Sequence, residues 1–268
     1  MGWSADEIDT ESAHSARMYD YFLGGKDNYP PDQKAAEKVL LVLPNARTIA
    51  KNNRYFMRRS ARMLAEEAGI RQFLDIGTGI PTSPNLHEVI QQIAPESRIV
   101  YTDNDPIVLT HARALLTSDP QGETAYAEAD LRDPGSILNA PELLETLDMS
   151  KPVALMMISI LHFVPPEYDH YAILDELVSA LPPGSYLALT NGTADFAPEE
   201  MKRAAAVYAA SRVPVRQRPK KEIERFFHGL ELVEPGVVPI HRWRPDDPSL
   251  GELTDAEVSM YGGVARKP

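Results

Sequence analysis

Short apolar runs alternate with longer, helix-like intervals from about residue 69 onward, and this alternation limits the fold most. Five runs lie at residues 72–76, 98–102, 124–127, 153–158 and 185–190, and two more lie at 230–240 and 257–265. Strands that alternate with helices, without tight hairpin turns, form right-handed crossovers and a parallel sheet. We therefore predict an α/β fold with an open, mostly parallel seven-stranded sheet and helices on both faces. The ligand site of such a sheet lies at the carboxyl ends of its strands.

The front of the chain, residues 1–68, lacks this alternation and is predicted to be a helical extension of the strand-and-helix domain at 69–268. Aromatic residues, a Gly-Gly break and a Pro-Pro stop in residues 1–31 indicate a short helix, a turn and an ordered arm. Helical patterns follow over 32–43, which a proline ends, and over about 45–68, which a glycine ends in the left-handed conformation. We expect the extension to form a lid over the site or to cover an edge of the sheet.

Composition argues against several classes of function. The chain has 27 Lys and Arg against 39 Asp and Glu, a net charge of −12, whereas nucleic-acid backbones bind clustered cations. It has no cysteine, and its 7 histidines show no metal-ligand spacing. The first residues are acidic and polar, and no apolar run reaches the roughly 18 residues of a membrane span. We expect a cytoplasmic protein without nucleic-acid, membrane or metal partners, and the pattern predicts no oligomeric state.

The first apolar run leads directly into a glycine turn, Asp-x-Gly-x-Gly, at Asp75, Gly77 and Gly79. Glycines let the backbone turn sharply and approach a ligand to a distance that a Cβ would block. The second run ends in Asp103 and Asn104. A carboxylate at that strand tip can accept hydrogen bonds from both hydroxyls of a ribose. The two strand tips together predict a site for a ligand that contains a nucleoside.

Two ligands are candidates for this turn: S-adenosylmethionine and a nicotinamide dinucleotide. The dinucleotide fingerprint needs a third small residue where Thr82 stands, and Asp75 would repel the pyrophosphate. S-adenosylmethionine has no phosphate, and its ammonium group suits a carboxylate at a strand end, so we favour the methyl donor. A purely structural turn, in which Asp75 only caps the following residues, is the third alternative.

Two further strand tips carry residues of interest. Asp130 and Leu131 follow the third run, where an acid or its neighbouring backbone can bond an adenine amino group, although a lone Asp there is more often a turn or cap residue. His162 follows the fourth run, beside the expected position of the transferred methyl group. An ordinary histidine pKa near 6.5 leaves much of the imidazole neutral at pH 7. His162 is therefore the best candidate base, and a packing role has equal weight.

These motifs, with Leu-Pro-Pro-Gly at 181–184, resemble those of class I S-adenosylmethionine-dependent methyltransferases over residues 70–268. The segments SARMYDYFLGGKDNY at 15–29 and YGGVARKP at 261–268 resemble an actinobacterial S-adenosyl methyltransferase family, formerly a domain of unknown function. The resemblance covers nearly the whole chain. It implies a Rossmann-like fold, methyl transfer and S-adenosylmethionine as the donor.

The resemblance also implies roles for single residues. The methionine part of the donor would meet Asp75, Gly77 and Gly79, the ribose Asp103, and the adenine Asp130, with Asn104 and Leu131 beside them. It implies no acceptor. Many amine-modifying relatives carry an Asp/Asn-Pro-Pro-Phe/Tyr motif after the fourth strand, where this chain has Ile-Leu-His-Phe-Val-Pro-Pro at 160–166. That departure argues against methylation of a DNA base or a glutamine amide and leaves O-, N- or C-methylation of a small molecule.

The aromatic front segment is the second candidate for contact with the acceptor. We expect Tyr19 and Tyr21 on the acceptor side, and Arg17 and Asn28 in contact with the acceptor. The segment must fold back on some surface, and a lid over the open side of the donor site would exclude water. The alternative is a helix that only covers a sheet edge.

Two basic stretches interrupt the acidic background. One face of the second long helix carries Arg47, Lys51, Arg54, Arg58 and Arg62. This face could receive an anionic acceptor or an acidic partner, but pairing with the protein's own carboxylates is favoured. The second stretch, at 212–221 on the connector after the fifth strand, is expected to form a wall of the acceptor pocket.

Three functions follow from these features. The leading one is S-adenosylmethionine-dependent transfer of a methyl group to a small molecule. The second is a regulatory protein that binds S-adenosylmethionine or S-adenosylhomocysteine without catalysis, motivated by the missing motif after the fourth strand. The third, an NAD(P)-dependent oxidoreductase, is disfavoured by Thr82 and Asp75.

Overall fold

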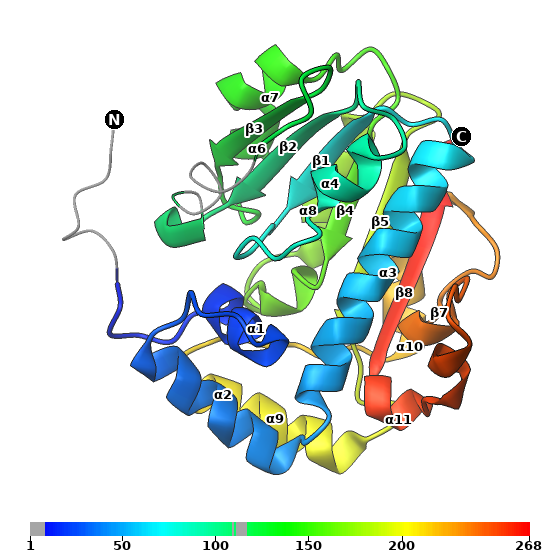
Figure 1. Cartoon of the computed structure of the whole chain (residues 1–268). Coiled ribbons are helices and arrows are strands. Elements are labelled where there is room, and N and C mark those ends of the chain that lie inside the picture. The colour runs from blue at the N-terminus through cyan, green and yellow to red at the C-terminus, as the bar shows by residue number, and fades with distance from the viewer. Residues whose placement is uncertain (1–8, 109, 111–116) are drawn as a thin grey trace.

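The computed structural model describes residues 9–108, 110 and 117–268, and within them one sheet runs through the molecule (Figure 1). Its strands are β1 (Gln72–Ile76), β2 (Arg98–Asp103), β3 (Glu123–Glu128), β4 (Ala154–Ile158), β5 (Tyr186–Gly192), β6 (Glu231–Leu232), β7 (Val238–Pro239) and β8 (Met260–Arg266). Their order is β3-β2-β1-β4-β5-β8-β6, with β7 also paired to β8. The pairs among β1 to β5 are parallel, and β8 is antiparallel to its neighbours. The predicted mostly parallel α/β sheet is confirmed.

The tail of the sheet differs in detail from the prediction. Residues 230–240, predicted as one strand, form the two short strands β6 and β7, because the chain turns at Gly236 with a φ of +82°. The last strand begins at Met260 instead of 257, because Asp255–Val258 form the short helix α11 with Thr254 as its side-chain cap. The sheet therefore has eight strands rather than seven.

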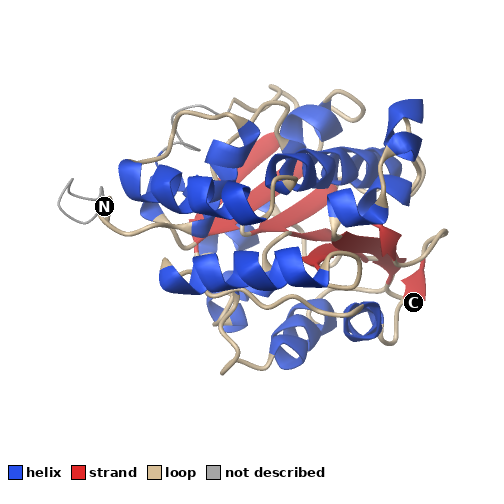
Figure 2. Ribbon diagram, turned by 90° about the horizontal axis from the view of Figure 1, so that it is seen from below, coloured by secondary structure: helices blue, strands red, loops and turns tan. Residues whose placement is uncertain are grey.

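Helices lie on both faces of the sheet (Figure 2). The remaining helices are α1 (Ser15–Leu23), α2 (Pro30–Val42), α3 (Ala46–Glu66), α4 (Leu86–Gln91), α6 (Pro134–Leu138), α7 (Pro141–Thr146), α8 (His170–Ser179), α9 (Pro198–Ala210) and α10 (Lys220–Glu224), with 3₁₀ turns η2 (Leu161–Phe163), η3 (Arg225–Phe227), η4 (Ile240–Arg242) and η5 (Pro248–Glu252). Phe56 of α3 and Trp243 pack on one face, and Leu174 of α8 and Ile223 of α10 on the other. None of the described helices is long and apolar enough to cross a membrane.

The front helices begin and end for recognisable reasons. The prolines at 30 and 31, predicted to stop the arm, instead begin α2, because the first turn of a helix does not need their missing N–H groups. Asp32 strengthens this start by accepting a hydrogen bond from the Tyr29 amide at 2.9 Å. After α3, Gly69 adopts a φ of +68°, the left-handed stop predicted from the sequence.

A third, smaller core holds α1, α2 and α9 together around Met18, Ala36 and Ala204. These three helices lie beyond the carboxyl ends of the parallel strands (Figure 1). The long helix α3 contacts α1 and α2 and also packs on β4 and β8. The front segment is thereby fixed to the sheet by α3, and α1 lies next to the sheet edge where ligands bind.

Candidate functional site

A cavity of about 280 Å³ lies at the carboxyl ends of β1, β2, β3 and β4. Its volume is near the lower end of the roughly 300–1,000 Å³ typical of small-molecule sites. Every residue predicted to hold the donor lines it: Asp75, Gly77, Gly79, Asp103, Asn104, Asp130 and Leu131. The opposite wall comes from residues 13–16, Tyr19 of α1, and Asn53, Arg54 and Met57 of α3. The structure therefore brings the predicted cofactor residues together in one site.

The turn after β1 depends on its two glycines. Gly77 and Gly79 have φ values of +71° and +69°, which residues with side chains rarely adopt. A Cβ at Gly77 would lie 2.5 Å from Cγ1 of Ile160, so the turn packs too closely for any larger residue. At Gly79 the nearest atom to such a Cβ would be that of Ala16 at 3.9 Å. Gly79 therefore presents open backbone to the cavity.

Asp75 lies half-buried at the end of β1 and lines the cavity. Burial raises the pKa of Asp75 to about 7, while the positive charge of Arg54 opposes the shift. Arg54 comes from α3 and donates to the carbonyls of Thr82 and Pro84 at 2.5 and 2.7 Å. The Thr78 hydroxyl lies within hydrogen-bond distance of Asp75 Oδ2, at 3.3 Å. Because a cation beside such an acid favours its ionised form, Asp75 is suited to an ammonium group.

Asp103 is buried at the tip of β2, and this burial raises the pKa of its carboxyl group. Its Oδ2 accepts from the Gly79 amide at 2.9 Å, and its Oδ1 accepts from the Asp105 amide at 2.9 Å. A carboxylate offers about four acceptor positions. Asp103 thus ties the glycine turn to β2 and retains one acceptor position on each oxygen for a ligand hydroxyl.

Asp130 is engaged more fully by the protein itself. It forms an ion pair with Arg132, and Asn104 donates to its Oδ2 at 3.2 Å. Burial acts to raise the pKa of Asp130, but the hydrogen bonds from Arg132 and Asn104 together outweigh it and hold the pKa below its ordinary value. Asp130 is therefore an ionised, oriented acid at the rim, and Leu131 adds apolar surface beside it.

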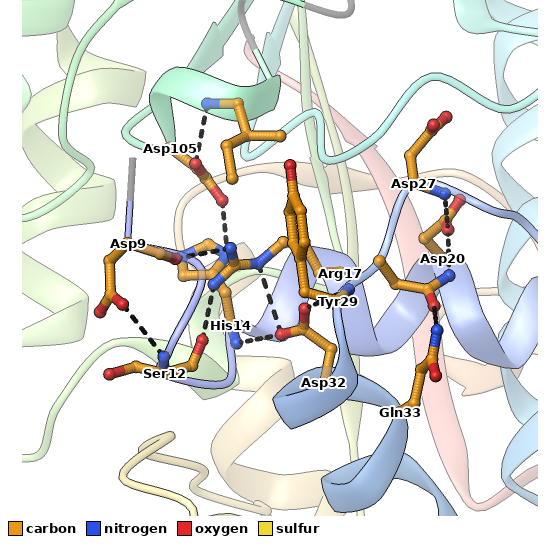
Figure 3. A network of polar contacts seen from close by, with 12 residues as sticks. Asp9, Ser12, His14, Arg17, Asp20, Asp27, Tyr29, Asp32, Gln33 and Asp105 are labelled. Atoms are coloured by element: carbon orange, nitrogen blue, oxygen red, sulfur yellow. Dashed lines mark hydrogen bonds and ion pairs between the residues drawn. The ribbon is translucent and has the colours of Figure 1, made fainter. Parts of the chain in front are cut away.

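Arg17 is not among the residues that line the cavity, whereas contact with the acceptor was predicted. It lies instead in a network of polar contacts around Asp32 (Figure 3). Its buried guanidinium donates to the carbonyls of Asp9 and Ser12 at 2.7 and 2.8 Å, and its Nε lies 3.3 Å from Oδ1 of buried Asp32. The His14 amide donates to the same Oδ1 at 2.8 Å. Arg17 therefore fastens the segment before α1 to the start of α2.

This fastened segment contributes residues that the sequence did not indicate. Nδ1 of His14 lies 3.1 Å from Oδ2 of Asp105, just beyond β2 (Figure 3). Residues 13–16 line the same cavity as a result. A signal existed for Asp105, since it belongs to the polar strand tip after β2, but no local pattern connects that tip to His14.

The two predicted tyrosines lie on different sides of α1. Tyr19 lines the cavity, whereas the Tyr21 hydroxyl donates to Glu37 at 3.2 Å. Positions two apart in a helix point in nearly opposite directions, so both side chains cannot face one site. Asn28 also lies away from the lining residues, where its side-chain amide donates to Asp20 at 2.7 Å. Of the four front residues predicted for the acceptor side, the structure brings Tyr19 alone to the cavity.

His162 lies on a second cavity, of about 80 Å³, which adjoins the first. The two cavities share Tyr19, Ser159 and Phe163 as lining residues. Burial lowers the pKa of His162 to about 3, and the nearby charge of Arg218 acts in the same direction. The imidazole is therefore neutral at physiological pH, and it is too weak a base to hold an abstracted proton. This differs from the predicted base, whose pKa was taken as ordinary.

Ser159 lines both cavities but was not among the predicted site residues. It lies directly after β4 with a φ of +63°, a strained conformation for a residue with a side chain. Its Oγ lies 3.4 Å from Nε2 of His162, and its amide donates to the Thr190 hydroxyl at 2.8 Å. Its place at a strand tip was the available signal, because ligand sites gather there.

Two of the five basic residues on the basic face of α3, Arg47 and Arg54, bond backbone carbonyls. Arg47 donates to the carbonyls of Tyr21 and Phe22 at 3.1 and 3.3 Å, and Arg54 likewise bonds backbone carbonyls. Neither Arg47 nor Arg54 forms an ion pair with a carboxylate of the described residues, so the predicted pairing is not seen at these two positions. Arg47 instead donates hydrogen bonds to backbone carbonyls in the last turn of α1, and Arg54 donates to carbonyls at the end of the glycine turn. Carbonyls at the end of a helix have no partner within the helix and need such donors.

The basic connector after α9 runs between the two cavities. Residues 212–214 line the larger cavity, and Val215 and Gln217 line the smaller one. Arg218 is buried and donates to Asn191 Oδ1 at 3.0 Å. The connector thus contributes mostly uncharged residues to these walls, although it is basic in sequence.

Comparison with known proteins agrees with this architecture. A DUF574 family protein from Streptomyces avermitilis is 57% identical, with 98% of this chain and 100% of that chain covered and a TM-score of 0.95. A candidate methyltransferase from Thermobifida fusca is 41% identical over 99% of this chain and 98% of that chain, with a TM-score of 0.91. Magnesium protoporphyrin IX methyltransferase from Synechocystis shares the fold, at 11% identity, 94% and 93% coverage and a TM-score of 0.54.

No curated protein matches the chain. The matching family model spans residues 1–268, so the match includes both the front helices and the glycine turn. The Rossmann-like class I methyltransferase fold and the resemblance noted from the motifs are both confirmed. The chain belongs to the S-adenosyl methyltransferase family.

Proposed function

We propose that the protein transfers a methyl group from S-adenosylmethionine, bound in the larger cavity, to a small-molecule acceptor. The observation that carries the site assignment is the convergence of three features in one cavity. These are the half-buried Asp75, the open backbone at Gly79 and the partly free carboxylate of Asp103. Together they match the ammonium group, the methionine chain and the ribose of the donor.

The cavity fits this donor better than a dinucleotide. The pKa of Asp75 is raised to about 7. A positively charged ammonium group bound beside Asp75 would favour the ionised form of the carboxyl group and pair with it. A pyrophosphate would need donors or cations at the same turn, but the Arg54 side chain already donates to Thr82 and Pro84. The family assignment also removes the oxidoreductase alternative.

The chain's residues would contribute chiefly binding and alignment. When bound, S-adenosylmethionine supplies an electrophilic methyl group on a sulfonium. Asp75 would hold the ammonium group, Asp103 the ribose hydroxyls, and Asp130 with Leu131 the adenine end. The segment at 13–16 and Tyr19 cover the cavity, which limits water near the reacting atoms. Alignment of this kind supplies much of the rate in a displacement between two bound molecules.

The proposal is tested in two steps. Calorimetry with S-adenosylmethionine, S-adenosylhomocysteine and NAD should show binding of the first two only, and binding of NAD alone would overturn the site assignment. Incubation with S-adenosylmethionine and a pool of metabolites should then release S-adenosylhomocysteine. Donor binding without any turnover across diverse acceptors would support the regulatory alternative instead.

A further inference from the structure

We propose that the smaller cavity is the acceptor site and that it takes an uncharged, mainly apolar molecule of about one ring that carries a hydroxyl group. This inference rests on the proposed function, since it places the acceptor next to the donor. The cavity lies among α1, α2, α3, the end of β5, α9 and the connector that follows α9.

The smaller cavity lies next to the larger one, where an acceptor would have to bind. Ser159, Tyr19 and Phe163 line both cavities, so a molecule in the smaller one borders a donor in the larger one. The boundary is held firmly: the Tyr19 hydroxyl donates to Ala50 O at 3.0 Å and accepts from Asn53 at 2.9 Å. The Asn53 amide oxygen in turn accepts from Thr190 at 2.7 Å. An acceptor bound here would face the end of β4, where the turn at Ser159 brings the two sites together.

The size and the lining of the smaller cavity limit which molecules it can hold. A cavity of about 80 Å³ has room for roughly five to eight water-sized groups at about 10–15 Å³ each, which corresponds to one substituted ring. Its lining is largely aliphatic and aromatic, with Phe22, Val39, Leu43, Met201, Tyr208 and Met260 among its residues. None of the described residues that line it is a Lys, Arg, Asp or Glu. A charged acceptor would lose its hydration there without gaining a partner.

His162 is a polar group in the wall of the smaller cavity to which an acceptor can bind. His162 is 5% exposed, lines the cavity, and its Nδ1 has no hydrogen-bond partner among the described residues. Buried polar atoms in folded proteins are normally paired. Nε2 of the same ring lies 3.4 Å from the Ser159 hydroxyl. Nδ1 is itself covered, so a small rotation of the imidazole would be needed for a ligand hydroxyl in the cavity to become its partner, and a neutral ring can bond that hydroxyl without a change of charge.

The test uses the protein loaded with S-adenosylhomocysteine and two one-ring probes, 4-fluorophenol and 4-fluorobenzoate, followed by ¹⁹F NMR titration. We expect 4-fluorophenol to bind and 4-fluorobenzoate to bind at least tenfold more weakly. His162→Phe should reduce the affinity for 4-fluorophenol roughly three- to tenfold, the usual effect of one hydrogen bond. Fluorobenzene affinity should stay unchanged in that variant.

Two filling variants locate the probe. A Cβ at Gly192 would lie 3.9 Å from Met201 Cε, so Gly192→Ala fits without a clash and narrows the cavity. Ala204→Leu fills it from α9, and Gly251→Ala, where a Cβ meets nothing within 4 Å, is the matched control. The filling variants should weaken 4-fluorophenol binding at least fivefold and retain S-adenosylhomocysteine binding. Phenol binding that both filling variants leave unchanged, or equal binding of the benzoate, overturns this inference. Failure of S-adenosylhomocysteine to bind the wild type would instead overturn the proposed function.

Discussion

Replacing Asp75 by Asn should make the ligand-free protein more stable at alkaline pH. The pKa of Asp75 rises from 3.8 to about 7 on folding, chiefly because of burial. One pKa unit corresponds to about 1.4 kcal/mol, so the full shift is worth about 4 kcal/mol. Asp75 is partly open to solvent through the cavity, and screening there reduces the expected effect to about 2 kcal/mol. Asn has nearly the same shape and cannot ionise, so it avoids this cost.

The sign follows from proton binding. Between pH 4 and 7 the unfolded Asp75 is ionised while the folded one still holds its proton, so the folded state binds more protons. Raising the pH through this window therefore destabilises the wild type relative to Asp75→Asn, and the difference stays constant above about pH 7. With a folded pKa of about 7, the difference at pH 5 should be about two fifths of its value at pH 8.

The assay is thermal unfolding, followed by circular dichroism, of both proteins at pH 5 and pH 8 without donor. A gain of about 2 kcal/mol corresponds to roughly 4–8 °C in Tm at pH 8 for a chain of this size. Asp133→Asn, at an exposed acid, is the control and should not change Tm. A lower Tm for Asp75→Asn at pH 8 would refute the reasoning, because it would mean that Arg54 keeps Asp75 ionised in the folded protein. We expect the affinity of the wild type for S-adenosylhomocysteine to rise from pH 6 to 8 as Asp75 ionises, and Asp75→Asn should lose this rise.

Three further predictions concern residues around the cavity. Asp103→Ala should weaken S-adenosylhomocysteine binding at least tenfold in calorimetry with an unchanged circular dichroism spectrum, whereas Asp133→Ala should leave the affinity unaltered. Arg17→Ala leaves a buried carboxylate unpaired and should cost about 3 kcal/mol in urea unfolding, with cleavage by protease appearing in residues 9–14; unchanged stability would contradict the fastening role. Gly77→Ala forces a Cβ against Ile160 at a φ of +71° and should destabilise the protein by at least about 1–2 kcal/mol, measured by the same unfolding.

The sheet, and the cavity that the predicted donor residues line, were predictable because their signals are local. The parallel strands β1, β2, β4 and β5 are short, mostly buried runs, and at the ends of β1 and β2 the predicted ligand residues Asp75 and Asp103 follow directly. The topology then brings these ends to one edge whatever the rest of the chain does. The region of β6 and β7 was misjudged because strands of two residues carry too little pattern to be separated from a turn.

The roles of the front residues depended on partners that no local pattern specifies. Arg17, predicted to contact the acceptor, is buried because Asp32 and the carbonyls of Asp9 and Ser12 converge on it. The low pKa of His162 has the same origin, since both its burial and the nearby Arg218 arise from tertiary packing. Residue type and spacing therefore indicated which residues matter, but packing decided what each of them does.

The same contacts bear on whether the front segment moves as a lid. Displacing α1 would release the pair between Arg17 and Asp32 into water and expose the buried side chains of Met18 and Phe22, at about 1.5–3 kcal/mol each. It would also break the hydrogen bonds of Tyr19 to Ala50 and Asn53, at about 1 kcal/mol each. That sum is comparable with the roughly 5–15 kcal/mol that stabilises a whole domain. An opening that moved α1 would therefore be close to global unfolding in cost. We infer that α1 is a fixed wall of the site, and that exchange of the donor depends on smaller movements of the loops around the cavity.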